Sequence, residues 1–375
     1  MKGVAMDSAG KQERLWSLDA FRGFDMLMIM GMDSLVISLG VLVFGGTGGW
    51  LADQMRHPDW FGLSFYDTIF PTFLFIAGIS FPFSLAKQRE RGQSVFQIDR
   101  KIVVRGVLLI ALGLVYNRIL QLDFSNFRYA SVLGKIGLAW ALAALVFVHF
   151  GRRTRIGICL VLIAGYAILL KTVVAPDFPD ASSLSVEGNF VGWLDRRFMP
   201  GRLYQSGLCE PSGIFCSFFS TATAMLGMFA GEIVRSADAT GARKALRLVL
   251  FGVALLVAGL AMTAGIPLSK KLWSPSFTLA VGGYSALLFA LFYWLVDVKG
   301  WRRWTYPLRV IGLNSIAIYM LQRIVDFRGI ARFFLGGVAS KVPEAAGAVI
   351  LAAGYVALCW LLLVFFDRKK VYFKV

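Results

Sequence analysis

The chain has 375 residues, of which 57% are hydrophobic and 16% are charged, and its mean hydropathy is +0.67. These values exclude an ordinary soluble domain and indicate a helical protein that crosses a membrane several times. The formal net charge is +17. Because the basic residues gather in short connections between apolar runs, we expect them to contact lipid head groups and do not expect a nucleic-acid partner.

Apolar runs long enough to cross a hydrocarbon core recur along the whole chain. Their length and hydropathy predict an all-α, polytopic integral membrane helix bundle with about ten transmembrane helices. The expected spans are 16–42, 64–85, 102–120, 131–149, 156–175, 214–233, 246–265, 276–297, 307–326 and 345–366. We do not expect the first span to be a removable signal peptide, because it is long and contains charged residues.

The placement of Lys and Arg predicts the orientation of the bundle. Basic residues concentrate in alternate connections such as "AKQRERGQ", "GRRTR" and "VKGWRR", so the positive-inside rule places both termini in the cytoplasm. We expect a cytoplasmic segment 1–15, a transmembrane domain 16–366 and a basic cytoplasmic tail 367–375. The longest external connection, about 176–212, is rich in aromatic residues and is predicted to form an ordered cap.

The four cysteines do not follow a metal-binding pattern. Cys159 and Cys359 fall within expected spans. Cys209 and Cys216 are close enough in sequence to pair on an oxidising face, although Cys216 is expected in a helix. The sequence has neither a CxxC motif nor a Cys/His ligand spacing, so we predict no metal site.

The first expected span carries charged residues at membrane depth. On one continuous helix, Asp19, Arg22, Asp25 and Asp33 would lie within an arc of about 120° and along about 21 Å. Such groups normally face a bundle interior or a wet cavity. They could line a polar pathway, or they could form an ion-pair network around Asp19 and Arg22 that fixes helix packing.

His57 is one of two histidines in the chain and directly precedes an expected span. Asp67 lies just inside that span, and Asp33 lies near the outer end of the first span. A carboxylate within hydrogen-bonding distance orients an imidazole and raises its proton affinity, as a general base requires. We therefore predict a site in which Asp33 orients His57 and Asp67 lies nearby. The alternative is a loop or capping histidine without a chemical role.

Three other polar residues fall within expected spans. Arg105 enters the third span from the cytoplasmic side, Lys135 begins the fourth from the outer side, and Asn314 lies in the middle of the ninth. Each could simply connect two helices through a hydrogen bond. Together with the charges of the first span, they could line a conduit that reaches both faces.

Eight ordered segments, which cover most of the chain, carry a resemblance to a known family. They are "RLWSLDAFRGFDMLMIM", "HPDWFGLSFYDTIFPTFLFIAGISF", "RYASVLGKIGLAW", "NFVGWLDRRFMPGRLY", "CEPSGIFCSFFSTATAMLGMFAG", "PLSKKLWSPSFTL", "LVDVKGWRRW" and "GLNSIAIYML". In these segments the chain resembles the lysosomal heparan-α-glucosaminide N-acetyltransferase family, as a bacterial-type relative without the luminal domain.

The resemblance implies a membrane acyltransferase with acetyl-CoA as co-substrate. Such an enzyme moves the acetyl group from the cytosol to an amine or hydroxyl of an extracytoplasmic sugar or glycan, and its catalytic histidine falls on His57. It also implies an integral protein of the bacterial plasma membrane, and relatives suggest a homodimer.

We expect His57 to act as general base while the acceptor attacks the thioester. An acyl-histidine intermediate is the alternative mechanism. Asn314 and Lys270 are candidate donors to the oxyanion. The residues expected to bind acetyl-CoA are Arg22, Arg105, Lys135 and Asp19; the sequence has no Walker or GxGxxG phosphate loop.

Several positions depart from the family pattern. Asp33 stands where the family favours asparagine, Arg202 replaces a histidine, and "EPSG" replaces "DPEG". A different acceptor, or a relative that has lost its activity, would fit these departures. A multi-pass transporter or flippase for a sugar or lipid-linked substrate is the alternative function. The lack of a visible repeat and of paired broken helices in the sequence disfavours it.

Overall fold

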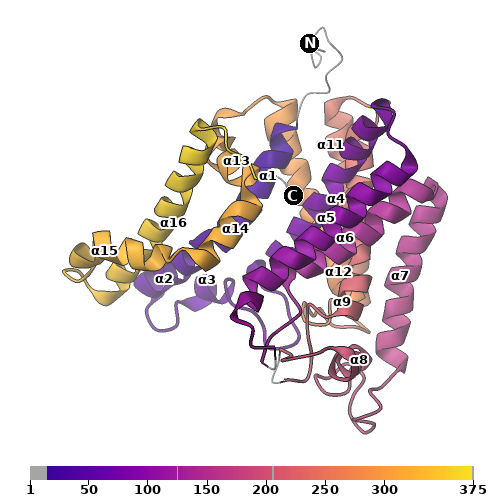
Figure 1. Cartoon of the computed structure of the whole chain (residues 1–375), viewed down its shortest axis with the longest axis horizontal. Coiled ribbons are helices and arrows are strands. Elements are labelled where there is room, and N and C mark those ends of the chain that lie inside the picture. Colours follow the sequence, from indigo (N-terminus) through magenta and orange to yellow (C-terminus); the bar gives the residue numbers. More distant parts are fainter. Residues whose placement is uncertain (1–14, 125, 205–206, 374–375) are drawn as a thin grey trace.

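The computed structural model describes residues 15–124, 126–204 and 207–373. Within these ranges the regular elements are helices, and the strand-like pairings are two isolated β-bridges. The long helices stand side by side in a bundle, and α16, α15 and α2 lie together at one edge (Figure 1). This architecture confirms the predicted all-α polytopic fold.

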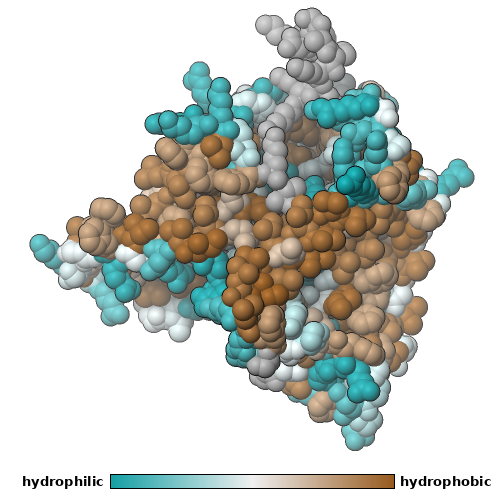
Figure 2. Space-filling view, in the orientation of Figure 1, coloured by the Kyte–Doolittle hydropathy of each residue, from teal (hydrophilic) through white to brown (hydrophobic). Residues whose placement is uncertain are grey.

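Eight helical segments in the described ranges are long and apolar enough to cross a membrane. They consist of α1 (Trp16–Leu27), η1 (Met28–Met32) and α2 (Asp33–Phe44) as one segment; α4 (Phe65–Glu90); α6 (Val132–His149); α7 (Arg152–Thr172); α9 (Ile214–Phe219) with α10 (Thr221–Arg235); α11 (Gly241–Met262); α12 (Pro275–Phe292) with η4 (Tyr293–Val298); and α16 (Glu344–Arg368). Hydrophobic residues form a broad band across the middle of the molecule (Figure 2).

The remaining helices are shorter or more polar. They are α3 (Gly49–Asp53), α5 (Val95–Tyr116), η2 (Ile119–Gln121), α8 (Phe190–Phe198), η5 (Arg303–Thr305), α13 (Tyr306–Leu313), α14 (Ser315–Ile324) and α15 (Phe327–Ala339). α5 covers much of the predicted span 102–120 but starts earlier, in a charged stretch. The predicted span 307–326 is divided into α13 and α14. The number of membrane crossings and the cytoplasmic position of the termini stay predictions.

The first predicted span is interrupted at its centre. η1 is a π-helical turn in which Gly31 adopts φ 102°, a left-handed conformation that favours glycine. Asp33 consequently begins a new helix, α2, after this kink. The prediction that Asp33 continues one helical face with Asp19 and Arg22 is therefore wrong, because that projection assumed an unbroken helix.

α1 packs directly against α13, so that two broken helices are neighbours. The contact is close because glycines line it: a Cβ on Gly23 would lie 1.7 Å from the carbonyl oxygen of Leu308, and one on Gly312 would lie 2.0 Å from that of Asp19. Neither break was predicted from the sequence. Because the structure contains two broken helices side by side, the expected lack of such helices does not argue against a transporter.

Replacing Gly23 with alanine should force α1 and α13 apart. Overpacking of this kind costs about 1–3 kcal/mol of stability, so we expect a lower melting temperature in detergent. Gly165→Ala on α7 is the matched control, because nothing lies within 4 Å of the added methyl group. Equal melting temperatures for the two variants would contradict the close contact.

The C-terminal helices have a core of their own. Buried residues of α13, α14, α15 and α16 pack around Met26 and Met30 of the first segment. The chain after α16 returns to the bundle, where Asn314 Nδ2 donates to the carbonyl oxygen of Val371 at 3.0 Å and Asn314 Oδ1 accepts from the Phe373 amide at 3.0 Å. Asn314 thus connects the helix break to the C-terminal tail.

The long connection between α7 and α9 forms a cap at one end of the bundle (Figure 1). It contains α8, and a β-bridge joins its two sides between Val174 and Asn189. Arg196 on α8 binds both carboxylate oxygens of Asp177 at 2.8 Å. All four cysteines are buried and free, so Cys209 and Cys216 do not form a disulfide.

Candidate active site

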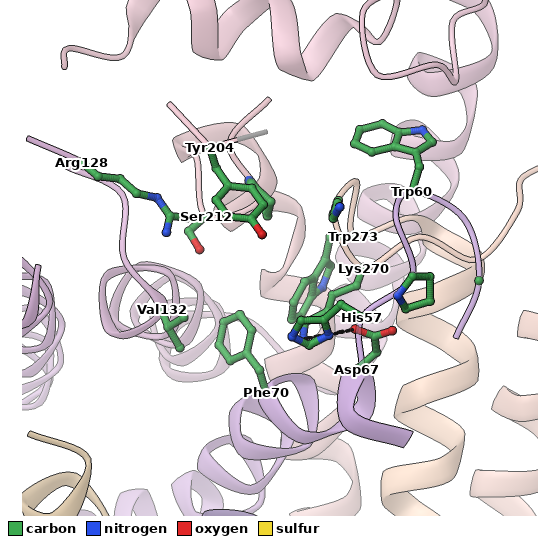
Figure 3. A pocket seen from close by; sticks show the side chains of 14 residues that line it. His57, Trp60, Asp67, Phe70, Arg128, Val132, Tyr204, Ser212, Lys270 and Trp273 are labelled. Carbon is green, nitrogen blue, oxygen red and sulfur yellow. Dashed lines mark hydrogen bonds and ion pairs between the residues drawn. The ribbon is translucent and has the colours of Figure 1, made fainter. Parts of the chain in front are cut away.

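His57 lies in the connection between α3 and α4 and pairs with the first turn of α4. Its Nδ1 is 2.6 Å from Asp67 Oδ1 (Figure 3). The other carboxylate oxygen, Oδ2, accepts from the Ser64 amide at 3.2 Å and the Ser64 hydroxyl at 3.1 Å, which forms a helix-capping box. The helix start therefore fixes the carboxylate that orients the imidazole.

The expected pair of His57 with Asp33 does not form. Asp33 lines a separate polar cavity that also includes Tyr355. Tyr66 lies between the two sites: its hydroxyl interacts with Asp33, and its ring centroid is 5.2 Å from that of His57. The kink at η1 redirects α2, which explains why Asp67 takes the role predicted for Asp33.

Lys270 joins this pair from the connection between α11 and α12. Its Nζ is 3.3 Å from Asp67 Oδ1 and 3.5 Å from His57 Nδ1. Burial lowers the pKa of Lys270 to about 8, even though the charge of Asp67 favours the protonated form. The structure thus brings together three of the predicted catalytic residues.

The pKa of Lys270 predicts a pH effect on activity. Below about pH 8 the ammonium group neutralises Asp67; as the pH rises through 8 this charge is lost, and we expect the rate to fall. In Lys270→Arg the cation persists, so the falling limb of the pH–rate profile should move to higher pH. The same falling limb in both proteins would show that another group is responsible.

The three residues open onto a cavity of about 240 Å³, which we call the histidine cavity. Aromatic side chains form part of its wall, and Arg128 faces His57 from across the space (Figure 3). Other lining residues are Pro58, Trp60, Gly62, Phe70, Val132, Tyr204, Pro211, Ser212, Lys271 and Trp273. The cap supplies several of them, so this segment helps to enclose the site.

A buried ion pair supports the cap side of the cavity. Arg128 binds Glu210 through two hydrogen bonds, of 2.8 Å from Nε and 2.6 Å from Nη2. Burial works in the opposite direction, but the bonds and charge of Glu210 hold the pKa of Arg128 above its ordinary value. Arg128 was not among the residues predicted from the sequence, although it is the first residue of the quoted segment "RYASVLGKIGLAW".

Lys135 is fully buried behind the histidine cavity and does not line it. Its Nζ donates to the carbonyl oxygen of Pro211 at 2.8 Å and lies 3.6 Å from the ring centroid of Trp273. Cys216 Sγ is a further partner at 3.2 Å. Lys135 thus supports two residues of the cavity wall.

The other predicted acetyl-CoA residues lie deeper in the bundle and outside the histidine cavity. Arg22 donates to Ser80 Oγ at 3.0 Å and lies 3.6 Å from Asp19. The Arg105 guanidinium stacks over Trp140, with its carbon 4.4 Å from the ring centroid. The guanidinium groups of Arg22 and Arg105 also repel each other, so two cations from α1 and α5 share one part of the bundle.

A narrow apolar space extends from the histidine cavity into the bundle. The two share Phe70 and Val132, and the space is also lined by Met26 of α1. Met26 is about one helical turn from Arg22. Apolar side chains therefore line the way from His57 toward Arg22 and Arg105. Asn314 does not line either space, and its amide binds the C-terminal tail.

Comparisons with known proteins found a family model and relatives with similar sequences. Residues 14–193, which include His57 and Asp67, match the family model described as "Heparan-alpha-glucosaminide N-acetyltransferase, catalytic". The protein named heparan-alpha-glucosaminide N-acetyltransferase from Homo sapiens is 26% identical over 418 residues, and that from Mus musculus is 25% identical over 416 residues. Each alignment covers 96% of this chain and 60% of the relative's length. Along nearly its whole length the chain is thus similar to heparan-α-glucosaminide N-acetyltransferases, and the match to the catalytic family model covers its N-terminal part.

Proposed function

We propose that the protein is a membrane acetyltransferase that transfers an acetyl group from acetyl-CoA to an amine or hydroxyl of a sugar. The observation that carries this proposal is the cluster of His57, Asp67 and Lys270 on the wall of the histidine cavity. The activity named for the human and mouse relatives supports the same reaction class.

His57 acts as the general base. Asp67 accepts the hydrogen bond from Nδ1–H, which leaves Nε2 unprotonated and, within the described residues, without a hydrogen-bond partner. Nε2 takes the proton of the acceptor as the acceptor nitrogen or oxygen bonds to the thioester carbonyl carbon. The C–S bond then breaks, and His57 returns the proton to the sulfur of CoA.

An acyl-histidine intermediate is the variant of this mechanism. In it, Nε2 attacks the carbonyl carbon and the acceptor then displaces the acetyl group from the imidazole. Lys270 is the candidate donor to the oxyanion in either route. A burst of CoA release before product formation would identify the covalent route, and its absence the direct one.

In this proposal acetyl-CoA arrives from the cytoplasmic face and the acceptor from the other face. Arg22 and Arg105 supply positive charge for the phosphate-bearing end of CoA. The apolar space beside Phe70 measures about 20 Å³, so its side chains must move apart to admit the pantetheine arm. The protein would then lie in a bacterial plasma membrane with His57 on the external side. A homodimer stays a prediction.

Sealed proteoliposomes test the proposal. With radiolabelled acetyl-CoA on one side and a glucosaminide on the other, we expect labelled acetyl-glucosaminide on the acceptor side. The transporter alternative predicts instead that the glucosaminide crosses the membrane unmodified when acetyl-CoA is omitted. Formation of acetyl-glucosaminide without uptake of unmodified glucosaminide would support the enzyme. Uptake of glucosaminide without acetylation would overturn the proposed function.

A further inference from the structure

A second cavity, of about 430 Å³, adjoins the histidine cavity. We call it the arginine cavity, because four arginines line it: Arg118, Arg128, Arg202 and Arg323. Arg128 also lines the histidine cavity, so its side chain stands between the two spaces. A molecule that reaches past Arg128 could therefore occupy both.

The arginine cavity has an excess of positive charge. Glu210 neutralises Arg128, and Asp123 is the acidic residue among the described lining residues. The side chains of Arg118 and Arg202 have no hydrogen bond or ion pair within the described ranges. Three guanidinium groups against one carboxylate favour an anion, and their planar donors match the oxygens of a phosphate.

Arg323 belongs to this set although its side chain is partly engaged. Its Nε donates to the carbonyl oxygen of Tyr116 at 3.3 Å. This bond positions the guanidinium group, but a carbonyl oxygen is neutral and does not cancel its charge. Arg118 and Arg323 also line a neighbouring cavity together with the acids Asp33 and Asp326. No ion pair joins these arginines to either acid in the described part of the chain. The positive charge is therefore available to a ligand.

An exposed apolar tip lies beside these arginines. In the connection after α5, the exposed fractions of Leu120, Leu122 and Phe124 are 75%, 68% and 53%. Arg118 and Asp123 of the same connection line the arginine cavity. Apolar side chains this exposed at the end of a bundle helix fit the boundary between lipid and head groups. The cavity therefore adjoins a surface suited to lipid.

We propose that the arginine cavity binds the phosphate of an acceptor sugar that is anchored in the membrane by an alkyl chain. The phosphate lies among Arg118, Arg202 and Arg323, the chain follows the apolar tip, and the sugar reaches past Arg128 toward His57. This inference rests on the proposed function and adds the acceptor's class: a phosphate-bearing glycolipid that enters from the lipid.

Three probes separate the contributions of phosphate and chain: glucosamine 1-phosphate, its decyl phosphodiester and the neutral decyl glucosaminide. Binding to the full chain in lipid nanodiscs is measured without acetyl-CoA. We expect the phosphodiester to bind most tightly. Arg118→Gln/Arg202→Gln should weaken both phosphate probes by about 10- to 100-fold and spare the neutral one.

Leu120→Ser/Leu122→Ser should weaken the two decyl probes and spare glucosamine 1-phosphate. Arg243→Gln, an exposed arginine at the start of α11, is the matched control and should bind all three probes as the wild type does. Elution volume and melting temperature establish that each variant is folded.

Equal binding of the phosphate probes to the wild type and to Arg118→Gln/Arg202→Gln would overturn the anion site. Arginine-dependent binding that gains nothing from the decyl chain would overturn the lipid anchor and indicate a soluble phosphosugar. Acetyl-CoA is added last. Probes that bind as expected but are never acetylated would overturn the proposed function and leave the anion site in place.

Discussion

Replacing His57 with alanine is expected to lower the rate of acetyl transfer by about 10²- to 10⁴-fold, because a positioned general base contributes that much. The side chain is 44% exposed and its polar partners are Asp67 and Lys270, which also bind each other, so its loss should leave the fold intact. The measurement is kcat for acetyl transfer to a glucosaminide in proteoliposomes, together with the melting temperature of each protein.

The other histidine provides the matched control. His149 is similarly exposed and also pairs with a carboxylate, Asp99, at 2.9 Å, but it is the last residue of α6 and does not line the histidine cavity. His149→Ala should therefore keep the wild-type rate. Wild-type turnover by His57→Ala would exclude the imidazole from the chemistry.

Asp67→Asn should lower kcat by a comparable amount, about 10²- to 10⁴-fold. The asparagine amide can hold the imidazole in place, but it no longer imposes the tautomer with Nδ1–H and Nε2 free. The amide oxygen can still accept from Ser64, so the start of α4 should lose at most about 1 kcal/mol. The measurements are kcat for acetyl transfer and the melting temperature of the wild type and of Asp67→Asn.

Asp53→Asn serves as the comparison for this variant. Asp53 also pairs with a cation near the same connection, Arg56 at 3.0 Å, but its side chain is 61% exposed. Its loss should change neither the rate nor the stability appreciably. If Asp67→Asn were as active as Asp53→Asn, the carboxylate would not control the tautomer of His57.

The sequence and the structure agree best where one segment decides the outcome. Hydropathy predicted the membrane class and most of the long helices, because an apolar run of sufficient length favours a span wherever it occurs. His57 was identified by its rarity and by its place before a span. The motif Ser64-x-x-Asp67 is a helix-capping pattern, so Asp67 could have been preferred over Asp33 from the sequence itself.

Other features depend on contacts between distant segments. Gly31 looks unremarkable in its apolar run, yet it adopts a left-handed backbone. Asn314 was a candidate oxyanion donor, but its amide binds the C-terminal tail. Arg128 meets Glu210 across 82 positions of sequence. No local pattern predicts such a pair, because the two residues meet only when the cap folds against the bundle.

By itself, the sequence determined an all-α membrane protein and a histidine beside a carboxylate at one end of it. Tertiary structure decided which carboxylate: the kink at η1 turns Asp33 away, and the start of α4 presents Asp67. It also brought Lys270 to this pair and closed the cap over them. The physical reason is that hydrophobicity acts residue by residue along the chain, whereas the short distances of a polar site arise when separate segments pack together.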